Sequence, residues 1–190
     1  MTETMPPPDA ARASRAVGAM FFSGFGAAWL ALWARSEFQS LLPMAAVVLA
    51  AAVLLGLAYR VYRANAPALR ASRNSPASMR RSRVFGIVNI AQWAAIFVVS
   101  LLLSRTGHAE FILPAVVFIV GLHFIPLARL FSYRPHYLTG TALMLLAAVY
   151  PFIGTAGPKS DIGALGAGVI LCLSAVWAIV PRRCSVPRVA

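Results

Sequence analysis

Long runs without a charged residue divide the chain into six apolar segments. Asp, Glu, Lys and Arg are absent from residues 16–34, 38–59, 84–104, 111–128, 135–158 and 162–181. A helix needs roughly 17–25 apolar residues to cross about 30 Å of hydrocarbon, and each run reaches that length. None alternates polar and apolar positions as the strands of a transmembrane barrel do. The pattern therefore predicts six membrane-spanning helices, at about residues 16–34, 38–59, 84–104, 111–128, 137–155 and 162–181.

The composition agrees with this pattern. Of the 190 residues, 60% are hydrophobic and 12% are charged, whereas soluble domains are about 45–50% apolar and about 25% charged. A soluble domain of this size could not bury so much apolar surface in one core. Disordered chains, in contrast, are polar and rich in charge. We therefore predict an all-α, polytopic integral membrane protein with a six-helix transmembrane domain over residues 16–181.

The first apolar run has a second interpretation as a signal peptide, because Arg12 and Arg15 precede it. The run is longer than the 7–15-residue apolar core of such peptides, and no convincing cleavage site of the A-x-A type lies near Ala34. We therefore interpret it as a retained helix. Residues 1–15 and 182–190 are then cytoplasmic tails, and we expect the first to be disordered.

Basic residues are unevenly shared between the two sides of the predicted bundle. Both tails, the second loop and the fourth loop together hold 14 of the 17 basic residues, and the other loops hold Arg35, Arg105 and Lys159. Short loops rich in Lys and Arg stay in the cytoplasm. Both termini are therefore predicted to face the cytoplasm.

The second loop is the most basic part of the chain, with seven arginines and no acidic residue from Arg60 to Arg83. The net charge of +12 is mostly this topology signal, so nucleic acid is not an expected partner. One interpretation is a loop that only orients the protein. The other is a short interfacial helix that contacts anionic lipids, at about 1 kcal/mol per basic residue, although Pro67 and Pro76 would interrupt it. The bilayer and its anionic lipids are thus the expected partners.

Polar side chains converge near the cytoplasmic boundary of the third and fourth spans. Asn89 and Gln92 share one helix face about 8 and 12 Å deep, and Trp93 continues that face. His123 lies about 8 Å deep on the next, antiparallel helix. Pro126 cannot donate to the carbonyl four residues earlier and should kink the helix beside His123. These five residues form a predicted ligand-binding layer, unless the amides and the imidazole serve only as hydrogen-bonding links between helices.

A second polar group lies at the edge of the fourth and fifth spans. Arg129, Arg134 and His136 form a candidate site for a lipid headgroup, because guanidinium groups bind phosphate in a bidentate manner. Arginines that only snorkel to the interface explain the same residues. A b-type haem is not expected, since it would need two axial histidines on facing helices, whereas His108 lies outside the spans and His136 at their edge.

Catalytic residues, cofactors and metal ions are not predicted. The six runs contain no carboxylate, and no cluster of His, Asp, Glu or Cys has the spacing of a metal site. Nucleotide-binding and nucleophile motifs are also missing from a usable context. The favoured function is therefore binding or passage of a small, neutral or weakly polar molecule at the polar layer. The alternatives are a non-catalytic interaction or lipid-associated scaffold subunit and, less favoured, an intramembrane enzyme that uses His123.

Small residues four positions apart predict close helix packing. Such pairs occur in the first and sixth spans: Gly24 with Ala28, Gly163 with Ala167, and Ala164 with Gly168. They could face another helix of the chain or a neighbouring molecule. A homo-oligomer or a membrane partner subunit is therefore compatible with the pattern.

Two segments between Val84 and Gly154 carry a resemblance to other proteins. They read Gly-Leu-His-Phe-Ile-Pro-Leu-Ala-Arg at 121–129 and Arg-Pro-His-Tyr-Leu-Thr-Gly at 134–140. The chain resembles small uncharacterised bacterial multi-pass integral membrane proteins over roughly its last four helices. This resemblance implies a location in the bacterial inner membrane and no particular activity.

Overall fold

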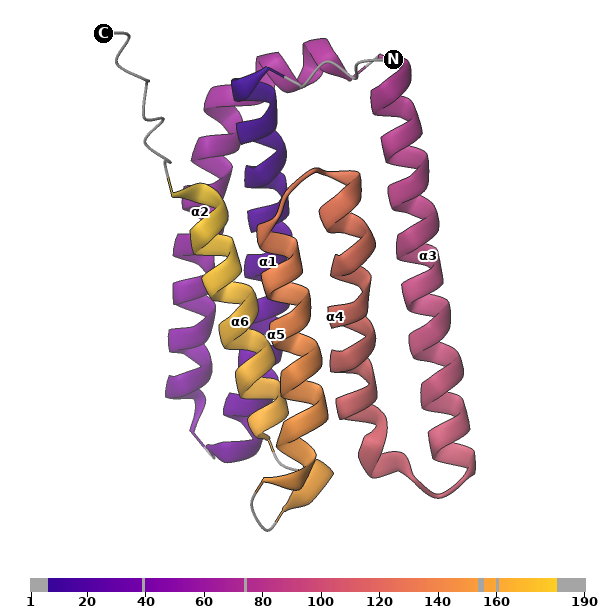
Figure 1. Cartoon of the computed structure of the whole chain (residues 1–190). Coiled ribbons are helices and arrows are strands. Elements are labelled where there is room, and N and C mark those ends of the chain that lie inside the picture. The colour runs from indigo at the N-terminus through magenta and orange to yellow at the C-terminus, as the bar shows by residue number, and fades with distance from the viewer. Residues whose placement is uncertain (1–6, 39, 74, 154–155, 160, 181–190) are drawn as a thin grey trace, which may run out of the picture.

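The computed structural model describes residues 7–38, 40–73, 75–153, 156–159 and 161–180. Over these ranges the chain is helical and contains no strand, so the all-helical part of the predicted fold class is confirmed. Figure 1 shows the helices running up and down as a bundle. Six are long: α1 (Pro8–Glu37), α2 (Leu41–Ser72), α3 (Pro76–Arg105), α4 (Ile112–Leu130), α5 (Pro135–Val149) and α6 (Ile162–Ile179).

Five of these helices are long and apolar enough to cross a membrane, namely α1, α2, α3, α4 and α6. The remaining helix, α5, has 15 residues, which corresponds to about 22 Å. It continues into a 3-10 turn, η2 (Tyr150–Phe152). The bundle is therefore compatible with a multi-pass membrane protein, and α5 is its shortest long helix.

The helices extend beyond the predicted spans at the basic end of the chain. Helix α1 begins at Pro8, so residues 8–15 of the expected tail are helical. Helix α2 continues through Pro67 to Ser72, and α3 begins at Pro76, so most of the predicted second loop is also helical. A charged residue ends an apolar run without ending a helix, so the helices can continue past the charge-free runs. Residues 1–6 and 181–190 lie outside the described residues.

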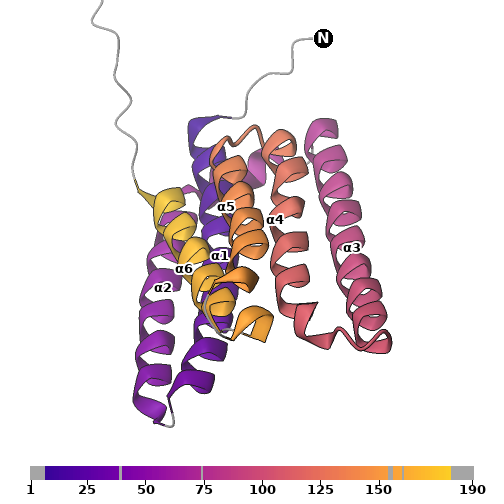
Figure 2. The ribbon, with the colours of Figure 1, turned by 60° about the horizontal axis from the view of Figure 1, so that its bottom comes forward.

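The helices pack in a sequence that leaves α3 at one edge. Helix α1 packs on α2 and α6, α5 lies between α4 and α6, and α3 packs mainly on α4; Figures 1 and 2 show α3 standing outermost. The starts of α1, α3 and α5 and the ends of α2, α4 and α6 share one end of the bundle. We call this the arginine-rich end, because every described arginine except Arg35 and Arg105 lies on its side.

Small residues allow α1 and α6 to approach closely, but only part of the predicted set is used. Gly163, Ala164, Ala167 and Gly168 of α6 are buried, as predicted. Gly24 and Ala28 of α1 are exposed, so they do not pack on another described helix of the chain, and a contact with a neighbouring molecule stays a prediction. Gly26 is the buried glycine of α1 at this contact, and an added Cβ there would lie 3.2 Å from the Gly168 carbonyl oxygen. Spacing predicts a stripe of small residues, whereas helix rotation decides which stripe is buried.

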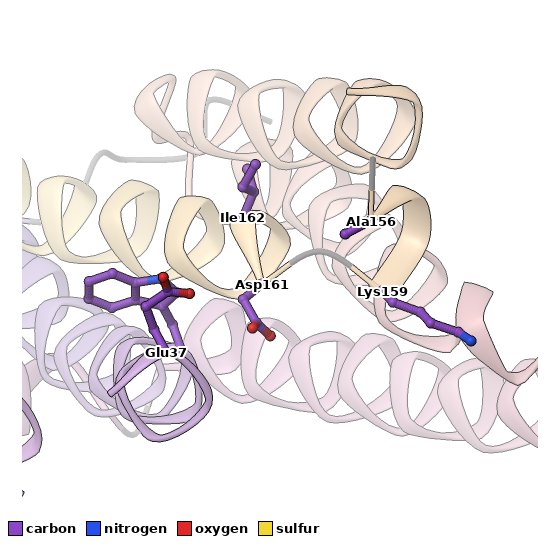
Figure 3. A pocket seen from close by; sticks show the side chains of 6 residues that line it. Glu37, Ala156, Lys159, Asp161 and Ile162 are labelled. Atoms are coloured by element: carbon purple, nitrogen blue, oxygen red, sulfur yellow. The ribbon is translucent and has the colours of Figure 1, made fainter. Parts of the chain in front are cut away.

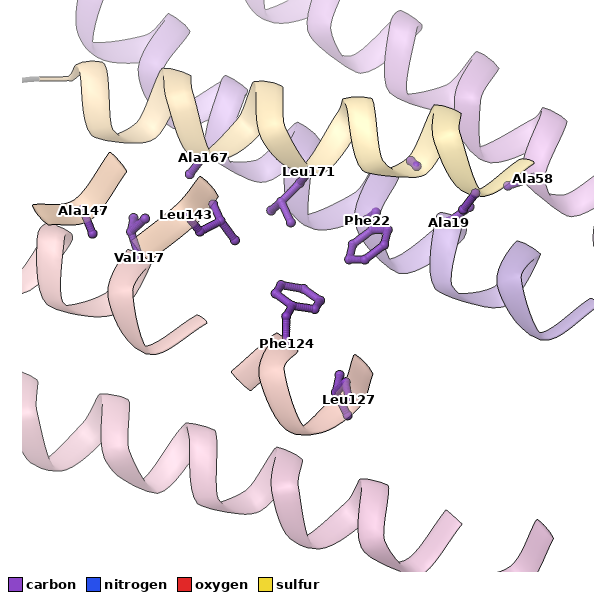
Figure 4. Close-up of a cluster of buried hydrophobic side chains, with 12 residues drawn as sticks. Ala19, Phe22, Ala58, Val117, Phe124, Leu127, Leu143, Ala147, Ala167 and Leu171 are labelled. Carbon is purple, nitrogen blue, oxygen red and sulfur yellow. The ribbon is translucent and has the colours of Figure 1, made fainter. Parts of the chain in front are cut away.

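Buried apolar side chains from α1, α4, α5 and α6, together with Ala58 of α2, form the core (Figure 4). Phe22 of α1 and Phe124 of α4 meet at its centre, with ring centroids 5.3 Å apart. Leu143 of α5 and Leu171 of α6 are almost completely buried beside them. This core extends toward the arginine-rich end, where the polar residues discussed next lie.

Candidate functional site

Two glycines bring α4 and α5 into close contact. A Cβ added at Gly140 would lie 2.6 Å from the Gly121 carbonyl oxygen, and one at Gly121 would lie 2.8 Å from the Gly140 carbonyl oxygen. His123 follows Gly121 by two residues, and His136 precedes Gly140 by four. Because the helices are antiparallel, both histidines lie toward the arginine-rich end of this crossing, by about 3 and 6 Å. The crossing therefore places the two histidines in one layer.

Aromatic rings pack against both imidazoles. The Phe124 ring contacts both, with its centroid 5.8 Å from that of His123 and 5.7 Å from that of His136. The His136 ring also meets Phe22 at 5.7 Å and Tyr133 at 4.9 Å, both edge-on. We call this group the histidine–aromatic layer; its members are Phe22, His123, Phe124, Phe131, Tyr133 and His136.

The two imidazoles hold polar atoms that the described residues do not satisfy. Nδ1 of His123 and Nδ1 of His136 are buried and have no hydrogen-bond partner there. The His123 ring also lies close to the backbone of Val88 on α3. In a neutral imidazole one ring nitrogen donates a hydrogen bond and the other accepts one. Nδ1 of each histidine can therefore pair with a polar group that the described residues do not provide.

The other four residues of the predicted ligand-binding layer differ in their burial. Asn89 and Gln92 are half-buried on α3, and no described residue hydrogen-bonds to their side-chain amides. Trp93 is 53% exposed and lies off this face. Pro126 is also exposed, and α4 continues through it to Leu130. The structure thus combines one imidazole with the α3 face that carries two amides.

The three residues predicted to bind a lipid headgroup do not lie together in the structure. Arg129 and Arg134 are exposed at the arginine-rich end. His136 turns inward and packs between Phe22 and Tyr133 instead. The sequence assigned His136 to the helix boundary by residue count, and no local signal showed that its ring would enter the core.

A further polar contact, between α5 and α6, was missed at the sequence level. The hydroxyls of Thr139 and Ser174 lie 2.8 Å apart and share a hydrogen bond. Each hydroxyl has one proton to donate. If Ser174 donates to Thr139, then Thr139 donates to the Pro135 carbonyl at 3.2 Å. If Thr139 donates to Ser174, then Ser174 donates to the Ile170 carbonyl at 2.8 Å. The sequence identifies both as hydroxyls within apolar runs, but they are 35 positions apart. Only the packing of α5 on α6 pairs them.

Two hollows lie on the surface of the described part of the chain, away from the histidine–aromatic layer. One is an apolar groove of about 350 Å³ on α1, lined by Met20, Phe21, Gly24 and Phe25. The other, also about 350 Å³, lies at the opposite end of the bundle (Figure 3) and is lined by Trp33, Glu37, Ala156, Lys159, Asp161 and Ile162. In that hollow Lys159 points away from the two carboxylates. Neither hollow is lined by a residue of the layer.

No group of three or more His, Cys, Asp or Glu residues in the described ranges could hold a metal ion. The chain has no significant match among known protein families, curated proteins or solved structures.

Proposed function

We propose that this chain is a six-span protein of the bacterial inner membrane, with both termini in the cytoplasm, that binds a small molecule at the histidine–aromatic layer. The sixth span in this proposal is α5, which packs along α4 and α6 and is extended by η2. The cytoplasmic assignment of the arginine-rich end follows from the positive-inside rule. The bacterial membrane follows from the resemblance of residues 84–154.

The observation that carries the proposal is the pair of buried, unpartnered Nδ1 atoms of His123 and His136. A buried polar atom without a hydrogen bond costs about 1–3 kcal/mol, and native chains keep few of them. A ligand that donates a hydrogen bond would remove this cost. Aromatic rings around the imidazoles favour a ligand with a flat apolar body, so a small molecule with a ring and one hydroxyl or N–H group fits best.

Helix α3 provides the route of entry in this proposal. None of its residues is fully buried, and it packs mainly on α4. Moving α3 outward would therefore expose His123 at the cost of few contacts, while the α1–α6 core stays intact. Asn89 and Gln92 would then line the entrance with two amide groups.

A matched pair of fluorinated probes tests this site. 4-Fluorophenol and fluorobenzene share a ring, but only the phenol can donate a hydrogen bond, and ¹⁹F NMR reports the binding of either one. We expect saturable binding of 4-fluorophenol to the purified protein and much weaker binding of fluorobenzene. His123→Leu and His136→Leu should each remove the difference between the probes. His108→Leu is the control, because His108 is exposed at the opposite end of the bundle.

Equal binding of the two probes to the wild-type protein would contradict the proposal. So would an unchanged preference for the phenol in both leucine variants of the layer. Thermal unfolding of each variant checks that the helices still pack. The topology has its own test: a green fluorescent protein fused to the C-terminus should fluoresce, and alkaline phosphatase at the same place should be inactive. The opposite pair of results would overturn the cytoplasmic assignment.

A second candidate function is a non-catalytic interaction subunit. It is favoured by α3, which combines two half-buried amides without a described partner with an otherwise exposed surface. In this case a helix of another molecule would cover Asn89 and Gln92. Replacing both with Leu should then reduce the oligomer that is seen by chemical cross-linking in membranes, and it should leave 4-fluorophenol binding unaffected.

A further inference from the structure

The outward face of α2 carries a continuous stripe of exposed residues. Its members follow one another at intervals of three or four positions, which places them along one side of a helix: Leu49, Val53, Gly56, Arg60 and Arg63. All five are exposed, and the exposed fractions of Leu49 and Val53 are 68% and 58%. We call this set the outer stripe of α2; it is apolar as far as Gly56 and basic beyond it.

The outer stripe lies opposite the side on which α2 packs. Ala58 is completely buried in the core cluster, and α2 packs mainly on α1. Since successive residues of a helix are about 100° apart, Arg60 lies about 160° and Arg63 about 140° round the helix from Ala58. Leu49 lies about 180° from Ala58 on the same basis. The apolar part of the stripe and its two arginines therefore face away from the bundle in the same direction.

Tyr59 marks the level at which the stripe changes from apolar to basic. Its side chain is 50% exposed, and its ring centroid lies 6.3 Å from that of Tyr62. Exposed tyrosines of membrane proteins collect at the level of the lipid headgroups. Arg60 and Arg63 follow Tyr59 by about 2 and 6 Å along the helix, and the headgroup region is about 5–8 Å thick. The two arginines therefore lie at the depth of the lipid phosphates.

The charge around this part of α2 favours an anion. The sequence from Arg60 to Arg83 contains seven arginines and no acidic residue. Figure 1 shows the last part of α2 crossing the arginine-rich end toward the start of α3, and this part adds Arg70. Of the described acidic residues, only Asp9 lies at this end of the bundle.

We propose that an anionic phospholipid binds along the outer stripe of α2, with an acyl chain on Leu49 and Val53 and its phosphate against Arg60 and Arg63. The apolar part of the stripe alone would accept the chain of any lipid, and the two guanidinium groups select the negatively charged headgroup. Gly56 lies between the two parts, and an added Cβ there would meet nothing within 4 Å, so the chain can pass close to the backbone. This proposal rests on the membrane location in the proposed function and is independent of the histidine–aromatic layer.

Photo-crosslinking in phosphatidylcholine vesicles tests the position of the lipid. The probes are trace amounts of phosphatidylglycerol or phosphatidylcholine with the same diazirine in one acyl chain, and mass spectrometry of the digested protein locates the label. We expect phosphatidylglycerol to label residues Leu49 to Gly56 more strongly than phosphatidylcholine does. Arg60→Gln and Arg63→Gln should each lower this labelling about fivefold, whereas Arg60→Lys, which keeps the charge, should lower it less. Arg105→Gln is the control, because Arg105 is exposed at the opposite end, and it should have no effect.

Three results would overturn the proposal. The first is equal labelling of the outer stripe by the two lipids in the wild-type protein. The second is unchanged labelling by phosphatidylglycerol when both arginines of the stripe are replaced by Gln. The third is loss of this labelling in excess inorganic phosphate, which would indicate a simple anion site. Flotation of the vesicles checks the membrane location separately, and His123→Leu should still be labelled, so failure of the lipid site and failure of the proposed function can be distinguished.

Discussion

Gly121 and Gly140 provide a direct test of the packing that positions the two histidines. In Gly140→Ala, the new Cβ would lie 2.6 Å from the Gly121 carbonyl oxygen and 3.1 Å from Cβ of Phe124. The first contact is with backbone, which cannot rotate away as a side chain can. Since ordinary contacts begin near 3.4 Å, α4 and α5 must separate by about 0.8 Å along this line.

The separation determines the expected loss of stability. A gap of 0.5–1 Å removes about a quarter to a half of each dispersion contact that it affects, and overpacked cores lose about 1–3 kcal/mol. Alanine also favours the helix over glycine by about 0.5–1 kcal/mol, which offsets part of this loss. We therefore expect Gly140→Ala to lower the free energy of unfolding by about 0.5–2 kcal/mol.

Reversible unfolding by sodium dodecyl sulfate in mixed micelles, followed by circular dichroism, measures this change. Gly86→Ala is the matched control, because an added Cβ there meets nothing within 4 Å. That variant should be as stable as the wild-type protein or slightly more stable. If the Gly140 and Gly86 variants unfold at the same detergent fraction, the close approach of α4 and α5 is wrong. The crossing would then not align His123 with His136 either.

Three further changes can be measured by the same unfolding assay. Thr139→Val removes the hydrogen bond to Ser174 and should destabilise the protein by about 0.6–2 kcal/mol; Thr141→Val, at an exposed position of the same helix, should not. Tyr150→Phe removes a buried hydroxyl that has no partner among the described residues, so stability should stay equal or rise by up to about 1 kcal/mol, and a clear loss would point to a missed partner. Gly163→Ala places a Cβ 2.5 Å from Cζ of the Tyr150 ring and should cost about 1–3 kcal/mol, which unchanged stability would contradict.

The sequence by itself determined that the chain is helical and where its apolar runs begin and end. Within hydrocarbon, backbone N–H and C=O groups must pair inside their own segment, so a charge-free run of sufficient length predicts a helix without knowledge of its neighbours. A charge-free run does not, however, predict where a helix ends. Residues 8–15 and most of residues 60–83 are helical, because basic residues end the apolar run and are compatible with a continuing helix.

Only the tertiary structure decided which side chains meet. Gln92 and Trp93 are adjacent in sequence, yet one is half-buried and the other exposed, because successive helical residues point about 100° apart. His136 joined His123 in the core because α4 and α5 cross at Gly121 and Gly140. Helix rotation and crossing points depend on contacts between residues far apart in the chain, and no local pattern encodes them. The charge-free runs therefore predicted the helices, and the packing of small residues brought the two histidines into one layer.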